Sequence, residues 1–151
     1  MKYIVCKKFN KKGIDSTFNL KKGSTLTKMQ DNYLYHNNLK VCYYDCDNAR
    51  EYFAKNDDGK GLERHALCES IKDKIKEIVK EYNALYIADL EAHKDIEDYV
   101  PNIVDTVSVA YGKIRANYPT FIKGNEDLFT IAFYNAEPNQ LEDILDRLQN
   151  N

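Results

Sequence analysis

The fold is decided by the stretch CESIKDKIKEIVKEYNAL, residues 68–85. Its apolar side chains are spaced alternately three and four residues apart, which is the pattern of one buried face on an amphipathic helix. They are Cys68, Ile71, Ile75, Ile78, Tyr82 and Leu85. Residues 62–98 contain neither proline nor glycine. The pattern predicts a long helix, with a break within residues 83–89 as an alternative.

The segment before this helix has the pattern of short strands joined by tight turns. Residues 2–44 contain several β-prone or alternating runs, which are separated by turn sequences rich in Asn, Gly and Lys. Asn37 and Asn38 are expected to form a two-residue hairpin connection. These signals predict an antiparallel β-meander of four or five strands.

The segment after the long helix predicts further helices. Pro101 is suited to the start of one helix, which would close before Pro119, and Pro138 is suited to the start of a final amphipathic helix. Residues 128–134 are an apolar run that fits either a strand or a short helix. The predicted fold class is therefore α+β, with an N-terminal antiparallel β-meander followed by long helices.

Length and charge describe the organisation of the chain. A chain of 151 residues predicts a single domain over residues 1–151. Residues 1–44 carry nine Lys against two Asp, although the whole chain has a net charge of −2. We therefore expect a basic β-rich part, residues 1–46, and a mainly helical part, residues 47–151. Such an asymmetry favours contact with an anion or an acidic surface, with a solvated lysine face as the alternative.

The chain has no transmembrane pattern and no signal-peptide pattern, and its four cysteines are expected to be reduced thiols. These features predict a cytoplasmic protein. Cys42 and Cys46 would lie roughly 13 Å apart in an extended strand, which is too far for two ligands of one zinc ion. No nucleophile elbow, Walker loop or HExxH motif is present. We expect no catalytic residue, no metal site, no cofactor and no enzymatic activity.

Residues 52–64, YFAKNDDGKGLER, are the strongest candidate for a ligand site. Two glycines just before a helix leave free backbone N–H groups, which favour a phosphate. The predicted phosphate contacts are Gly59, Lys60, Gly61 and Arg64. Asn56 or Asp58 would bind ribose hydroxyls.

Aromatic side chains and a later arginine are predicted to complete this site. Tyr52, Phe53 or Tyr44 would provide a stacking face for a base, and Arg115, from this chain or a second subunit, would close the pocket. In the alternative, Asp57 or Asp58 caps the helix and the aromatic residues belong to the core.

The same stretch resembles a family of small proteins encoded by phages and prophages of low-GC Gram-positive bacteria. The resemblance also rests on KYIVCKKF near the N-terminus and on the FYNA sequence of residues 133–136, and it covers roughly residues 1–72 and 126–148. It implies a viral accessory protein, with counter-defence as a leading role, although an unrelated accessory role is an alternative. It carries over no catalytic residue.

Two kinds of counter-defence protein fit this chain. One sequesters a nucleotide-derived immune signal of the cyclic ADP-ribose or cyclic oligonucleotide type, as anti-Thoeris sponges do. The other blocks a host protein, as anti-CRISPR proteins do. We expect a homo-oligomer, a dimer or larger, that uses the apolar stripe of residues 68–85 and the helix after Pro101. In the alternative, the stripe packs only on the C-terminal helices. We expect neither a membrane nor DNA as a partner.

Overall fold

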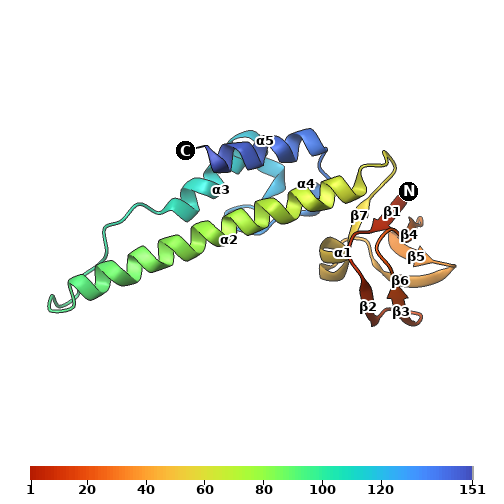
Figure 1. Ribbon diagram of the computed structural model, residues 1–151, viewed down its shortest axis with the longest axis horizontal. Coiled ribbons are helices and arrows are strands. Elements are labelled where there is room, and N and C mark those ends of the chain that lie inside the picture. The colour runs from red at the N-terminus through yellow and green to blue at the C-terminus, as the bar shows by residue number, and fades with distance from the viewer. Residues whose placement is uncertain (151) are drawn as a thin grey trace.

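The strands precede the helices along the chain, apart from the short helix α1 (Asp47–Tyr52), which lies between the last two strands (Figure 1). The computed structural model describes residues 1–150. Five strands form one antiparallel sheet in the order β6-β5-β4-β1-β7. Their bounds are β1 (Lys2–Val5), β4 (Thr25–Lys28), β5 (Tyr33–His36), β6 (Leu39–Tyr43) and β7 (Phe53–Lys55). The strands β2 (Phe9–Lys12) and β3 (Thr17–Leu20) pair separately as a hairpin.

The predicted α+β class and N-terminal meander are confirmed. Asn37 and Asn38 connect β5 to β6, and both have positive φ, 49° and 64°. This is the backbone conformation that a two-residue hairpin needs, and asparagine tolerates it better than most residues. Along β4 and β5, Leu26 and Leu34 are buried, so one face of the sheet points into a core.

The β-rich part extends further than the predicted boundary at residue 46. After the short helix α1 (Asp47–Tyr52), β7 returns to the sheet and pairs with β1, with Tyr3 opposite Lys55. Ala49 and Phe53 are buried in the core of the β part. The sequence does not predict this strand, because its pairing partner lies about fifty residues away in the chain.

The helical part consists of α2 (Gly61–Ala92), α3 (Thr106–Asn117), the 3-10 helix η1 (Pro119–Phe121), α4 (Ile131–Tyr134) and α5 (Pro138–Gln149). The long helix α2 continues through residues 83–89 without a break. The prediction for Pro101 is wrong, because α3 starts only at Thr106. Asp105 is its N-cap and accepts a hydrogen bond from the Ser108 N–H at 3.0 Å.

The apolar stripe of α2 is used mainly inside the chain. Cys68, Ile71 and Ile75 are buried in a second core, which α2 forms with α3, α4, α5 and η1. The predicted oligomer interface required these residues to contact a second subunit. Their burial inside the chain makes them unavailable for that contact. Farther along α2, Leu85 is 59% exposed. That end of α2 extends beyond α3 and α5 (Figure 1).

Candidate functional site

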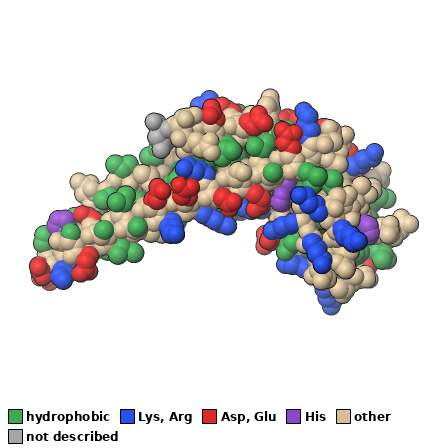
Figure 2. All heavy atoms as spheres, in the orientation of Figure 1, with side chains coloured by type: hydrophobic (Ala, Val, Ile, Leu, Met, Phe, Trp, Pro, Cys, Tyr) green, Lys and Arg blue, Asp and Glu red, His purple; other side chains and the backbone are tan. Residues whose placement is uncertain are grey.

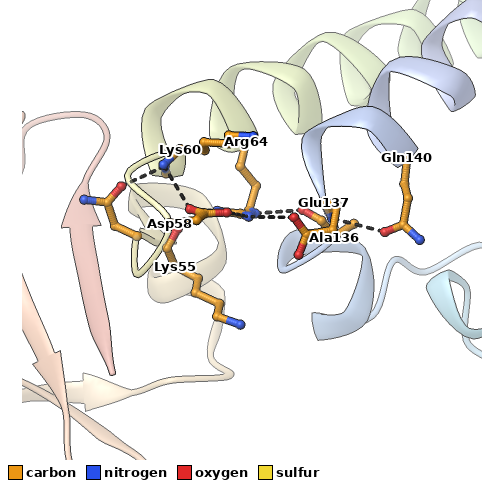
Figure 3. Close-up of polar contacts among 9 residues, drawn as sticks. Lys55, Asp58, Lys60, Arg64, Ala136, Glu137 and Gln140 are labelled. Atoms are coloured by element: carbon orange, nitrogen blue, oxygen red, sulfur yellow. Dashed lines mark hydrogen bonds and ion pairs between the residues drawn. The ribbon is translucent and has the colours of Figure 1, made fainter.

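The loop before α2 uses its polar side chains to hold its own backbone (Figure 3). The Asp58 carboxylate accepts a hydrogen bond from the Lys60 N–H at 2.9 Å, and the Asn56 side-chain oxygen accepts one from the Gly61 N–H at 2.8 Å. Asp57 accepts from the Lys2 N–H at 2.8 Å, which fastens the loop to β1. These bonds satisfy backbone donors that the predicted site reserved for a phosphate.

Among residues 1–150, Arg64 is the one charged residue that is buried, and its side chain is 1% exposed. Its Nε donates to the Ala136 carbonyl and its Nη1 to the Lys55 carbonyl, each at 2.7 Å. Its Nη2 donates to Asp58 Oδ2 at 2.7 Å. All three guanidinium nitrogens are thus engaged within the protein. The structure places Arg64 as a clamp between the β part and the turn before α5, and this differs from the predicted phosphate contact.

The predicted stacking residues do not form one surface around Arg64. Phe53 is in the β core, with its ring centroid 5.1 Å from that of Phe9. Tyr52 is half-buried under Lys7 and Lys11, whose Nζ atoms lie 4.8 and 5.0 Å from the ring centroid.

Tyr44 and Arg115 make their described contacts elsewhere. Tyr44 follows β6, and the Nζ of Lys28 lies 4.8 Å from its ring centroid. Arg115 Nη2, on α3, donates to the Glu126 carbonyl at 3.1 Å and to Asp127 at 3.0 Å. Of the ten predicted residues, the structure brings together Asn56, Asp58, Gly59, Lys60, Gly61 and Arg64 at the start of α2. Gly59 has a positive φ of 74°, and the Lys60 side chain is exposed.

A different hollow lies where the β part meets the helical part. This junction pocket, of about 630 Å³, lies between α1, α2, the residues just before α4, and Tyr134. Its lining consists of four basic residues, four acidic residues and three apolar or aromatic ones. They are Lys7, Arg50, Lys72, Lys76, Asp47, Glu51, Glu69, Asp127, Leu128, Phe129 and Tyr134.

Cations surround one aromatic ring in the junction pocket. The Cζ of Arg50 lies 5.7 Å from the centroid of the Tyr134 ring, and the Nζ of Lys72 lies 5.5 Å from it. Burial raises the pKa of Tyr134 above its ordinary value, so the phenol stays neutral at pH 7. The pocket therefore offers a neutral hydroxyl beside two cations.

Three of the four cations that line the pocket are paired with carboxylates. Lys7 forms an ion pair with Glu51 at 3.0 Å and Lys72 with Glu69 at 3.4 Å, while Arg50 Nε donates to Asp45 at 2.8 Å. These pairs are half-exposed, so they contribute little to stability and an anionic ligand can compete for the cations at small cost. Sequence reasoning missed the pocket because its residues come from four separate segments. The unusual use of arginine at position 50, in a chain that prefers lysine, was its single local signal.

The four cysteines differ in their surroundings. All four are free thiols; Cys6 and Cys68 are buried, while Cys42 and Cys46 are half-buried. Burial raises the pKa of Cys6 and of Cys68 to about 12. Cys46 is the N-cap of α1, and its Sγ accepts a hydrogen bond from the Ala49 N–H at 3.4 Å. A hydrogen bond from the Cys42 thiol, together with this backbone N–H, lowers the pKa of Cys46 to about 6.

Cys46 is therefore expected to be alkylated first when the folded protein is treated with iodoacetamide at pH 7. A thiol with this pKa is mostly thiolate at that pH, and the thiolate is the reactive form. Peptide mapping by mass spectrometry after short exposure measures the order of reaction. Cys46→Ser is expected to remove the fast phase, and equal rates at Cys46 and Cys68 would contradict the assignment.

Two further features of the described residues bear on the kind of site. Among residues 1–150, no cluster of three or more His, Cys, Asp or Glu side chains is placed to hold a metal ion. Within the same residues, no helix has the length and apolar character needed to cross a membrane. No family model, curated protein or solved structure matches the chain.

Proposed function

We propose that the chain binds a phosphorylated, nucleotide-type small molecule in the junction pocket and sequesters it without cleaving it. The observation that carries this proposal is the cluster of Arg50, Lys72 and Tyr134. Arg50 and Lys72 supply charge-assisted hydrogen bonds to phosphate oxygens, and the neutral Tyr134 hydroxyl supplies one more.

The remaining lining fits the other parts of a nucleotide. A volume of about 630 Å³ is within the range of small-molecule sites. Glu51 and Glu69 also line the pocket, and their carboxylate oxygens can accept hydrogen bonds from ribose hydroxyls. Phe129 and Leu128 offer apolar surface for a base. The pocket thus combines cations, hydrogen-bond acceptors and an aromatic wall. These are the same kinds of contact that the sequence predicted for the loop of residues 52–64.

The resemblance to phage and prophage proteins supports a role for this binding. A viral protein that holds an immune signal in the host cytoplasm keeps it from its receptor, and this requires affinity rather than catalysis. The proposed ligand class is therefore a signal of the cyclic ADP-ribose or cyclic oligonucleotide type.

The test is a thermal-shift and calorimetric titration of the full chain with cyclic ADP-ribose, cyclic di-AMP, AMP and inorganic phosphate as probes. A ligand that binds only the folded state raises the melting temperature by mass action. Lys72→Ala is expected to weaken binding roughly tenfold, because it removes one charge-assisted hydrogen bond. Lys74→Ala is the matched control, since Lys74 is on the same helix but does not line the pocket.

The bound probe should be recovered unchanged after denaturation and chromatography. A converted product would contradict binding without cleavage. If none of the four probes shifts the melting temperature, or if Lys74→Ala weakens binding as much as Lys72→Ala, the assignment of the pocket to this ligand class is wrong.

A second candidate function is inhibition of a host protein through the basic surface of the β part. Figure 2 shows Lys and Arg side chains gathered over these strands. The exposed lysines of this surface are Lys2, Lys8, Lys11, Lys12, Lys21 and Lys22. They favour an acidic partner surface, and capture of a host protein from lysate that weakens as salt is raised would support this function.

A further inference from the structure

The far half of α2 exposes a face that nothing else in the described chain covers. Lys76, Lys80, Asn83, Ala84, Ile87 and Glu91 follow one another at helical spacing, and all six are exposed. Ile87 is 65% exposed. Beside this face runs a mainly apolar groove of about 610 Å³, lined by Ile75, Val79, Ile87 and Tyr111 among others.

The C-terminal half of α2 exposes apolar side chains of the kind that usually pack against another protein. It extends beyond α3 and α5 (Figure 1), so its helical turns lack packing on most sides. Isolated helical turns are marginal in water, and most helices are stabilised by packing of an apolar face. Ile87 is 65% exposed and Leu90 is 38% exposed, and the two lie one turn apart on the same side of α2. Adjacent apolar exposure of this kind marks an interaction surface.

The charges of this face are complementary to those of an identical face that lies antiparallel to it. Its first part carries Lys76 and Lys80, and its last part carries Glu91, with further acidic side chains beyond the helix end. Figure 2 shows acidic side chains gathered at the free end of α2. Two copies arranged antiparallel with their centre between residues 83 and 84 place Lys76 of each copy opposite Glu91 of the other. Asn83 and Ala84, which are small, then lie at the crossing point.

We infer that a second copy of this chain packs its α2 antiparallel against this face, about a two-fold axis near Asn83 and Ala84. Ile87 of each copy then lies against the Lys80 stem and Val79 of the other. The contact is isologous, so each favourable pair occurs twice. A second copy is favoured over an unrelated protein because both halves of the charge pattern lie on this one face. The inference does not require the proposed ligand, although Lys76 lines the junction pocket as well as this face.

The interface differs from the one predicted from the sequence. That prediction used Cys68, Ile71 and Ile75, which are buried in the chain's own core. The face proposed here is formed by the exposed positions of residues 76–91 instead.

Sedimentation equilibrium of the full chain tests the dimer. We expect a concentration-dependent monomer–dimer equilibrium. Ile87→Lys is expected to raise the dissociation constant by more than about tenfold, because two apolar contacts are lost and each new lysine faces Lys80 of the other copy. Leu85→Lys is the matched control: it makes the same chemical change at an exposed position on another side of α2 and should leave the dimer intact. Circular dichroism checks that both variants keep the helix.

A charge-swap experiment tests the register. Lys76→Glu and Glu91→Lys are each expected to weaken self-association roughly tenfold, because each replaces two attractions with two repulsions. Mixing the two variants should restore association as a heterodimer, since every pair across the interface is then attractive. The double variant should also dimerise like the parent.

Three outcomes would overturn the inference. One is a parent chain that remains monomeric at about 1 mM. Another is a dimer that Leu85→Lys disrupts and Ile87→Lys does not. The third is a mixture of the two charge variants that fails to associate. If the chain is monomeric and Ile87→Lys abolishes capture of a host protein, the face belongs to that protein rather than to a second copy.

Discussion

Arg64→Ala is expected to lower the free energy of unfolding by about 3–5 kcal/mol. The substitution leaves the carbonyls of Ala136 and Lys55 without their donors and leaves a space where the side chain is 1% exposed. It also releases the clamp that joins the loop before α2 to the turn before α5. Equilibrium unfolding in urea, followed by circular dichroism, measures the loss.

Two variants serve as comparisons for Arg64→Ala. Arg64→Lys should recover only part of the stability, because an ammonium group cannot place donors along the three directions that the guanidinium uses. Arg115→Ala removes an arginine whose side chain is 31% exposed and pairs with Asp127, so it should cost less than about 1 kcal/mol. Equal losses in Arg64→Ala and Arg115→Ala would show that Arg64 is not a structural clamp.

The stability that the pair of Arg64 and Asp58 contributes depends on pH, and it is lost in acid. The hydrogen bond from Arg64 and the Lys60 N–H lower the pKa of Asp58 to about 2, below its ordinary value of 3.8. A depressed carboxylate pKa gives stability that is fully present above the unfolded value and is lost as pH falls from about 4 through 2. In Asp58→Asn, the loss of stability over this acid range should be smaller than in the parent.

Local patterns were enough to predict much of the fold. The spacing of apolar residues located the long helix, the pair Asn37 and Asn38 located a hairpin, and Pro138 located the start of α5. Each of these signals acts over a few residues, through side-chain periodicity or backbone φ. The strand β7 was not predictable in this way, because its state depends on pairing with β1 rather than on its own three residues.

The candidate site was less predictable than the fold, and the reason is physical. Two glycines just before a helix, with Lys60 and Arg64 close by, favoured a phosphate site, but Arg64 pairs with Asp58 instead. The decisive acceptor, however, is the carbonyl of Ala136, which lies seventy-two residues later in the chain. The junction pocket depends in the same way on contact between Tyr134, Lys72 and Arg50. No local pattern encodes such distant neighbours.

Gly61→Ala is expected to lower the free energy of unfolding by about 2–3 kcal/mol. A Cβ at this position would lie 2.6 Å from Ile4 Cγ2, 2.8 Å from Asn56 Oδ1 and 3.0 Å from the Lys55 carbonyl oxygen. Two of these neighbours belong to the sheet, so the first turn of α2 would have to move away from β1 and β7. The Asn56 contact would suffer as well, because its oxygen accepts the Gly61 N–H. Urea unfolding measures the change.

Gly112→Ala is the matched control, because a Cβ there meets no atom within 4 Å and the residue lies inside α3. Since alanine has a higher helix propensity than glycine, this variant should raise the free energy of unfolding by about 1 kcal/mol. The opposite signs separate two explanations of Gly61. If glycine served only to let a phosphate approach the backbone, Gly61→Ala would leave the unliganded fold as stable as the parent. If glycine is needed for the close contact of α2 with the sheet, as the distances indicate, the unliganded protein itself must lose stability.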